Sequence, residues 1–90
     1  MAWTIRLSKE AEKQLEKLSP DRQRIIFKAI DGMNEDPFRG NVKPLKGKEW
    51  EGRYRKVAGR YRIVFIPYYK EQIIEISGIL LRTEKTYRVY

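Results

Sequence analysis

The fold of this chain is decided by one continuous stretch of its sequence, Tyr54-Arg55-Lys56-Val57-Ala58-Gly59-Arg60-Tyr61-Arg62-Ile63-Val64-Phe65. Aromatic and β-branched residues alternate there with charged ones, a pattern typical of half-buried strands. Ala58-Gly59 interrupts the alternation, and glycine supplies the positive φ that a tight turn needs. We therefore predict two paired antiparallel strands, residues 50–58 and 60–67.

The same alternation assigns side chains to the two faces of this predicted hairpin. Tyr61, Ile63 and Phe65 share one face of the second strand, and Arg62 lies on the other. Helices are expected to cover only one face of the sheet. We expect the aromatic side to form core, and Arg55 and Arg62 to lie on an uncovered basic surface, which leaves no unpaired charge in the core.

Upstream of the hairpin, the sequence predicts one strand and two helices. Residues 2–7 alternate with period two, as a strand does. Ser8 and Ser19 are favourable helix N-caps, and Pro20 follows the second of them at the first helical position. Asp36-Pro37 ends the second helix because the residue before proline avoids helical geometry.

The remaining segments complete an α+β domain. Residues 35–49 contain prolines and glycines among charges and are expected to form a basic loop, and the isoleucine-rich residues 72–78 predict a third strand. Residues 79–90 fit either a short strand or a mobile tail. The predicted fold is one domain, residues 1–90: an N-terminal strand, a helical hairpin, and an antiparallel β-meander with the hairpin packed on one sheet face.

The distribution of charge indicates an anionic partner. The 90 residues carry 20 Lys and Arg against 12 Asp and Glu, a net charge of +8. Residues 39–62 alone carry nine basic and two acidic side chains, so the excess is local. We interpret this stretch as a polyanion-binding surface, with a merely basic surface or an acidic protein partner as the alternatives.

Residue types that are missing narrow the chemistry. The chain has no His and no Cys, which excludes disulfides, thiolate nucleophiles, imidazole acid–base catalysis and zinc sites built from these residues. We expect no metal and no cofactor. No apolar run approaches the roughly 20 residues of a membrane span, so we expect a cytoplasmic protein that does not contact a membrane.

The hairpin stretch, the preceding Leu45-Lys46-Gly47, and a C-terminal Arg82 and Tyr87 together resemble the RelE/ParE superfamily of toxins from type II toxin–antitoxin modules. The resemblance covers nearly the whole chain. It implies a RelE-like fold and, from the RelE branch, a ribosome-dependent, metal-free mRNA endonuclease that inhibits translation. RelE-like toxins use Lys, Arg and Tyr in place of histidines, so the missing imidazoles fit this chemistry.

The resemblance implies roles for four residues. Arg62 is expected to clamp the scissile phosphate, and Arg55 to belong to the same phosphate-binding or acid–base group. Arg82 is expected to act as a second phosphate ligand or proton donor, and Tyr87 as the base or as a stacking platform. The expected RNA- or phosphate-binding residues are Lys43, Lys46, Lys48, Arg53, Lys56 and Arg60.

This sequence departs from the family's frequent form, Tyr-Arg-x-Arg-x-Gly-Asp-Tyr-Arg, at two positions. Val57 replaces its second Arg and Arg60 replaces its Asp. Arg82 and Tyr87 are also one residue further apart than in the commonest form, which leaves Arg88 and Tyr90 as alternatives to Tyr87.

The resemblance also implies partners. These are a cognate antitoxin whose acidic or extended segment covers the basic face, mRNA in the ribosomal A site, ribosomal RNA, and operator DNA bound only as the toxin–antitoxin complex. Two other functions remain open at this point. One is a ParE-like inhibitor of DNA gyrase, and the other is a catalytically inactive binding module with the toxin fold.

Overall fold

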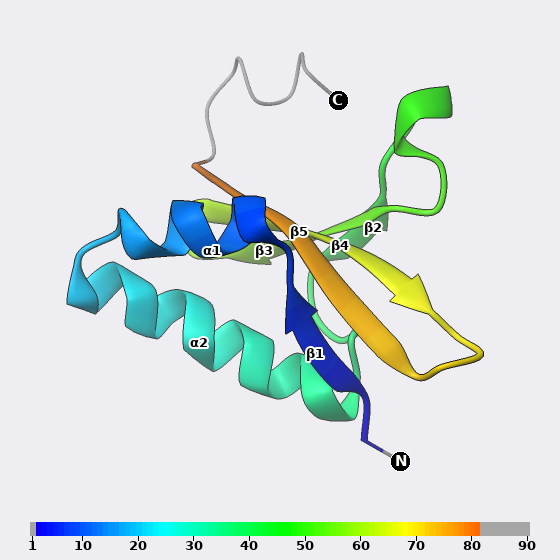
Figure 1. The fold of residues 1–90 in the computed structure, drawn as a ribbon, viewed down its shortest axis with the longest axis horizontal. Helices are drawn as coiled ribbons and strands as arrows, with labels where there is room; N and C mark the ends of the chain where they lie inside the picture. The colour runs from blue at the N-terminus through cyan, green and yellow to red at the C-terminus, as the bar shows by residue number, and fades with distance from the viewer. Residues whose placement is uncertain (1, 82–90) are drawn as a thin grey trace.

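A five-stranded sheet and two helices make up the computed structural model, which describes residues 2–81. The sheet has the order β1-β5-β4-β3-β2, and all neighbours are antiparallel except β1 and β5, which run parallel (Figure 1). The elements are β1 (Thr4–Leu7), α1 (Lys9–Glu16), α2 (Pro20–Glu35), β2 (Val42–Pro44), the 3-10 turn η1 (Lys48–Trp50), β3 (Tyr54–Ala58), β4 (Tyr61–Tyr68) and β5 (Ile73–Leu81). The predicted α+β architecture is confirmed.

Both helices begin at the predicted serine caps. The Ser8 hydroxyl accepts a hydrogen bond from the Ala11 backbone N–H at 3.1 Å, and Ser19 accepts from Arg22 at 3.4 Å. Each bond satisfies one of the N–H groups that the first helical turn leaves without a partner. The second helix ends at Glu35, and Asp36 adopts extended geometry before the proline.

The β3–β4 hairpin forms as predicted, but its first strand is shorter than expected. Gly59 at the turn has φ +60°, the left-handed region that favours glycine. The prediction that the strand starts at residue 50 is wrong, because η1 ends at Trp50 and Gly52, with φ +79°, makes a further turn before Tyr54.

The expectation of a loop over residues 35–49 is also wrong in part. Residues Val42–Pro44 form β2, which pairs with β3 at the edge of the sheet. Three residues are too few to show a period, and Pro44 reads as a breaker in the sequence. An edge strand tolerates proline because one side of it needs no donor for a neighbouring strand.

The last two strands extend beyond the predicted ends. β4 continues through Pro67 to Tyr68, where β5 is its neighbour and β3, which begins opposite Phe65, is no longer alongside. Residues 79–81 belong to β5, and the remainder of the ambiguous segment lies outside the described residues. A register shift opposite Val64/Phe65 places Ser77 in a β-bulge.

The hydrophobic core lies between the helices and one face of the sheet. The predicted core residues Tyr61, Ile63 and Phe65 are buried there, as are Ile74 and Ile76 of the neighbouring strand. Neither described helix is long and apolar enough to cross a membrane. The opposite face of the sheet, which we call the open face, is where the candidate site lies.

Candidate functional site

Three basic side chains share the open face across three adjacent strands. Lys43 of β2 pairs with Arg55 of β3, and Arg55 pairs with Val64 of β4. Directly paired residues point to the same side of a sheet. Arg62 lies two residues from Val64 and is therefore also on this face, diagonal to Arg55. Diagonal neighbours of this kind lie about 7–8 Å apart. At this separation, the two arginine side chains can contact adjacent phosphate groups of one strand.

Arg62 is held more firmly than its position on the open face suggests. It is only 3% exposed, and its Nη1 donates a hydrogen bond to the Tyr61 carbonyl oxygen at 3.3 Å. The sequence analysis expected it on an uncovered surface. On the sheet it is flanked by Val57 of β3 and Leu80 of β5.

Arg55 is less buried than Arg62 and has a lighter restraint. Its Nη1 donates to the Asn41 side-chain oxygen at 3.5 Å, at the upper limit for a hydrogen bond. The open face therefore combines one fixed guanidinium with one that can adjust its position.

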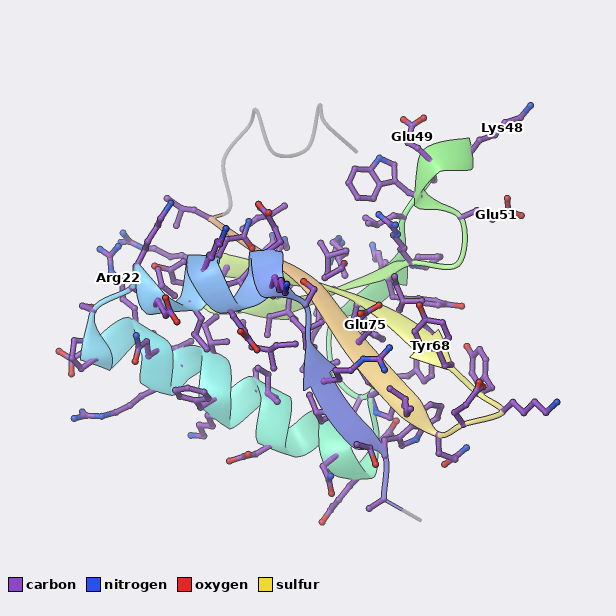
Figure 2. The ribbon with its side chains drawn as sticks, in the orientation of Figure 1. Arg22, Lys48, Glu49, Glu51, Tyr68 and Glu75 are labelled. Carbon is purple, nitrogen blue, oxygen red and sulfur yellow. The ribbon has the colours of Figure 1, made fainter. Side chains whose placement is uncertain are left out.

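Among the described residues 2–81, the other half of the open face carries no comparable excess of positive charge. Glu75 of β5 lies beside Tyr68 (Figure 2) and accepts a hydrogen bond from its hydroxyl at 3.3 Å. Glu75 also lies 3.7 Å from the Arg6 guanidinium. This acidic group balances the charge of Arg6. The positive potential is therefore concentrated over β2, β3 and β4.

A pocket of about 190 Å³ opens beside these basic residues. Its floor is formed by open-face residues Val64, Gly78 and Leu80, and its rim by Trp50 and Arg53 from the β2–β3 loop. The Arg53 guanidinium lies 5.5 Å from the centre of the Trp50 ring, which is cation–π geometry. The complete lining is Gln14, Trp50, Arg53, Val64, Ser77, Gly78 and Leu80.

Gln14 reaches this pocket because β1 is short. The strand ends at Leu7, opposite Ile76, so it does not continue alongside the end of β5. The Gln14 side-chain oxygen accepts the Ile79 backbone N–H there at 2.6 Å. Gln14 of α1 thus provides a hydrogen-bond acceptor for the edge of β5 and lines one side of the pocket.

A larger hollow of about 550 Å³ lies within the β2–β3 loop, away from the paired arginines. Its lining includes one lysine and one glutamate, so it does not gather positive charge. Figure 2 shows Lys48, Glu49 and Glu51 at the tip of this loop, pointing away from the sheet. In residues 2–81, no acidic side chains are grouped so as to hold a metal ion.

The sequence was also compared with known families and solved structures. The family described as the ParE toxin of type II toxin–antitoxin system, parDE, matches residues 5–86. The chain belongs to this toxin family. The match includes all of the toxin's strands β2, β3, β4 and β5, and all of β1 except Thr4.

Solved structures of related toxins share the fold of this one. The toxin–antitoxin complex RelBE2 from Mycobacterium tuberculosis contains a chain with a TM-score of 0.80 and 23% identity, covering 91% of this toxin and 100% of that chain. The RelE–RelB complex from Pyrococcus horikoshii gives 0.77 and 22%, with 93% and 99% covered. The YoeB/ParE toxin from Agrobacterium tumefaciens gives 0.75 and 17%, with 89% and 99% covered. None of the curated proteins compared matches the toxin in sequence.

The remaining residues singled out from the sequence are dispersed. Lys46 and Lys48 are exposed in the β2–β3 loop, and Arg60 is exposed in the β3–β4 turn. Arg53 lies at the rim of the pocket. The C-terminal candidates Arg82, Tyr87, Arg88 and Tyr90 lie outside the described residues.

Lys56 lies on the helix side of the toxin's sheet, away from Arg55. It pairs with the core residue Ile63, and its Nζ donates to the Arg39 carbonyl oxygen at 2.6 Å. Desolvation lowers the pKa of Lys56, and nearby Arg39 lowers it further, while Asp36 acts in the opposite direction. The structure therefore does not bring Lys56 together with the open-face residues.

The pocket residues Gln14, Ser77 and Gly78 were missed by the sequence analysis. Gly78 carried one usable signal, since a glycine within an apolar strand often marks a bulge or a close approach of backbone to a ligand. Gln14 offered none. Its role arises from a contact between residues 65 positions apart in the chain.

Proposed function

We propose that this toxin binds messenger RNA on its open face and cleaves it on the ribosome without a metal ion. The observation that carries the proposal is the placement of Lys43, Arg55 and Arg62 on one face of adjacent strands, beside a pocket with an aromatic rim. Phosphate contacts made by such side chains position an RNA strand without regard to sequence. An aromatic group next to them suits an unstacked base.

The proposed reaction is attack by the ribose 2′-oxygen on the adjacent phosphorus. The 2′-hydroxyl loses its proton, the new P–O bond forms, and the bond to the 5′-oxygen breaks as that oxygen gains a proton. The products are a 2′,3′-cyclic phosphate and a free 5′-hydroxyl. No oxidant, reductant or cofactor is consumed.

The two arginines of the open face suit the charged step of this reaction. Negative charge builds on the non-bridging phosphate oxygens, and a guanidinium that is already in place stabilises it without reorganising. The restrained, buried Arg62 fits this role, whereas the half-buried Arg55 is suited to capturing the substrate. The residues proposed to move protons are Arg82 and Tyr87, with Arg88 or Tyr90 as the alternative to Tyr87.

The proposed protein partner is a cognate antitoxin. Two of the similar structures are complexes of a toxin with its antitoxin. An acidic or extended antitoxin segment would meet a complementary surface over β2, β3 and β4. We propose that the active toxin works in the cytoplasm, where it contacts mRNA and ribosomal RNA. Operator DNA is proposed to be bound only by the toxin–antitoxin complex.

The test is induction of the toxin in growing cells, followed by primer extension on translated messages. The wild type is expected to give discrete cuts, and Arg55→Ala to weaken them strongly. Arg24→Ala is the matched control, because it removes an equally charged side chain from the helix side, where Arg24 pairs with Asp21 at 3.2 Å. Equal cutting by the wild type and by Arg55→Ala would contradict the proposed role of the open face.

A second candidate function is inhibition of DNA gyrase, which the description of the matching family favours. The same induction experiment separates the two. Loss of DNA supercoiling with intact messages would support the gyrase candidate and overturn the endonuclease proposal. Normal growth with neither signal would point to an inactive binding module.

A further inference from the structure

From the 190 Å³ pocket we infer that the toxin holds one unstacked RNA base on its open face, against Trp50 and over Gly78. The inference rests on the proposed function for its ligand class, RNA. It assigns a recognition site, formed by residues outside the proposed catalytic group.

The size of the pocket suits a single flat ring system. A cavity of about 150 Å³ lined by apolar side chains is known to admit benzene. At about 190 Å³, the present pocket is somewhat larger. One base fits this space, whereas a stack of two does not.

The floor of the pocket is apolar, and at one of its positions, Gly78, there is no side chain. Val64 and Gly78 are cross-strand partners, with Leu80 next along β5. A Cβ at Gly78 would lie 4.0 Å from the Val64 Cβ and 3.7 Å from the Gln14 side-chain oxygen, so it would fit. A longer side chain there would extend into the space that the base needs.

The aromatic rim is held in position by backbone hydrogen bonds. The Trp50 N–H donates to the Gly47 carbonyl at 3.1 Å, and the Arg53 N–H donates to the Trp50 carbonyl at 3.0 Å. Leu45 donates to the Arg53 carbonyl at 3.0 Å, which ties the two sides of the loop together. A stacking surface that is already fixed loses little entropy when a base binds.

The polar groups of the lining complement the edge of a base. The oxygen of the Gln14 amide is used by Ile79, which leaves its nitrogen as the donor. The Ser77 hydroxyl donates to the Val64 carbonyl at 3.3 Å, which leaves its lone pairs as acceptors. Base edges carry both acceptors and donors, so both groups can be satisfied.

The neighbouring charge favours a nucleotide over an aromatic side chain from a protein. Val64 in the floor is the direct partner of Arg55, and Arg53 lies at the rim. A base bound over Val64 therefore has its own phosphate within reach of a guanidinium. An aromatic side chain carries no phosphate for these cations to bind.

The experiment measures how the full-length toxin binds a short single-stranded RNA and a set of copies with one abasic nucleotide at each position in turn. Binding is followed by fluorescence anisotropy of labelled RNA and by amide shifts of Ser77 and Gly78 in NMR spectra. The variants are Trp50→Ala and Gly78→Leu, which remove the rim and fill the floor. Trp3→Phe is the control, because Trp3 packs edge-on against Tyr69, 5.9 Å away, outside the pocket.

One abasic copy is expected to bind about 5- to 150-fold more weakly than intact RNA, the range for loss of one base–aromatic contact. Trp50→Ala and Gly78→Leu are expected to lose a similar factor on intact RNA and to show no further loss with that copy. Their dependence on salt is expected to stay as in the wild type, because no phosphate contact is removed. Trp3→Phe is expected to bind as the wild type does.

Equal affinity of the wild type for intact RNA and for every abasic copy would overturn the inference, and needs no variant that has to fold. A tryptophan-containing peptide that shifts the Ser77 and Gly78 amides when RNA does not would overturn it too. Base-dependent binding without message cleavage in cells would support the pocket and refute the endonuclease. Message cleavage by a toxin that binds every abasic copy as tightly as intact RNA would support the endonuclease and overturn the pocket.

Discussion

Replacing Lys43 or Lys56 by methionine distinguishes the two faces of the sheet by the salt dependence of RNA binding. Both lysines belong to the most basic stretch of the chain, and methionine keeps much of the apolar length of the side chain. Lys43 pairs with Arg55 on the open face, whereas Lys56 pairs with core residue Ile63 on the helix side. We expect only the first substitution to remove a phosphate contact.

The magnitude follows from the number of open-face cations over β2, β3 and β4. For single-stranded nucleic acid, the logarithm of the binding constant falls with the logarithm of salt with a slope of about −0.7 per neutralised phosphate. Lys43, Arg55 and Arg62 together give a slope of about −2.1, or about an 18-fold loss of affinity between about 50 and 200 mM salt. Lys43→Met is expected to reduce the slope by about 0.7 and that loss to about 7-fold.

The assay is fluorescence anisotropy of a labelled single-stranded RNA at a series of salt concentrations. Lys56→Met is expected to keep the slope of the wild type, because the Lys56 Nζ donates to the Arg39 carbonyl on the other side of the sheet. Circular dichroism checks that both variants are folded. Equal slopes for the wild type and Lys43→Met, or a loss of slope in Lys56→Met, would refute the assignment of phosphate contacts to the open face.

Three further predictions concern the stability of the fold, each measured as the free energy of unfolding in urea. Ser19→Ala removes the N-cap of α2 and is expected to cost about 1 kcal/mol. Gly59→Ala forces a side chain into φ +60° and is expected to lower the free energy of unfolding by about 1–2 kcal/mol. The control is Gly32→Ala, where nothing lies within 4 Å of the added Cβ, and it is expected to raise the free energy of unfolding by up to about 1 kcal/mol. A loss of stability in both variants would contradict the role of φ at Gly59. Burial lowers the pKa of Lys56, so the unfolded chain keeps this proton to a higher pH, and stability is expected to rise with pH towards 10.5. That contribution is expected to be absent from Lys56→Met, and an identical pH profile for the two proteins would contradict it.

Local sequence signals were sufficient for most of the fold. Ser8 and Ser19 were recognised as caps because a capping side chain acts on a backbone N–H within its own helical turn. Gly59 gave the position of the hairpin turn, and the alternation of residues then predicted that Arg55 and Arg62 share a face. These features depend on residues close together in the chain, where spacing carries the information.

Features that depend on the ends of distant strands could not be predicted in this way. β2 has no period of its own and forms because Val42–Pro44 lies against β3. Gln14 enters the pocket because β1 stops opposite Ile76, and no local property of α1 indicates where that strand stops. Arg62 lies between Val57 of β3 and Leu80 of β5, and that set of neighbours depends on the order of the whole sheet.

The register also changes the meaning of the basic segment. Residues 39–62 contain nine basic side chains, and nine phosphate contacts would give a salt slope of about −6.3. The fold distributes these side chains among the open face, the helix side, the loop and a turn, and leaves three of them on the open-face strands β2, β3 and β4. A toxin that binds RNA through a diffuse basic cloud would show a slope near the larger value and would change little with any single substitution. A slope near −2.1 that falls by a third on loss of Lys43 requires binding on the open face. Only a fixed strand register lets one lysine of this segment contact a phosphate and keeps another from doing so.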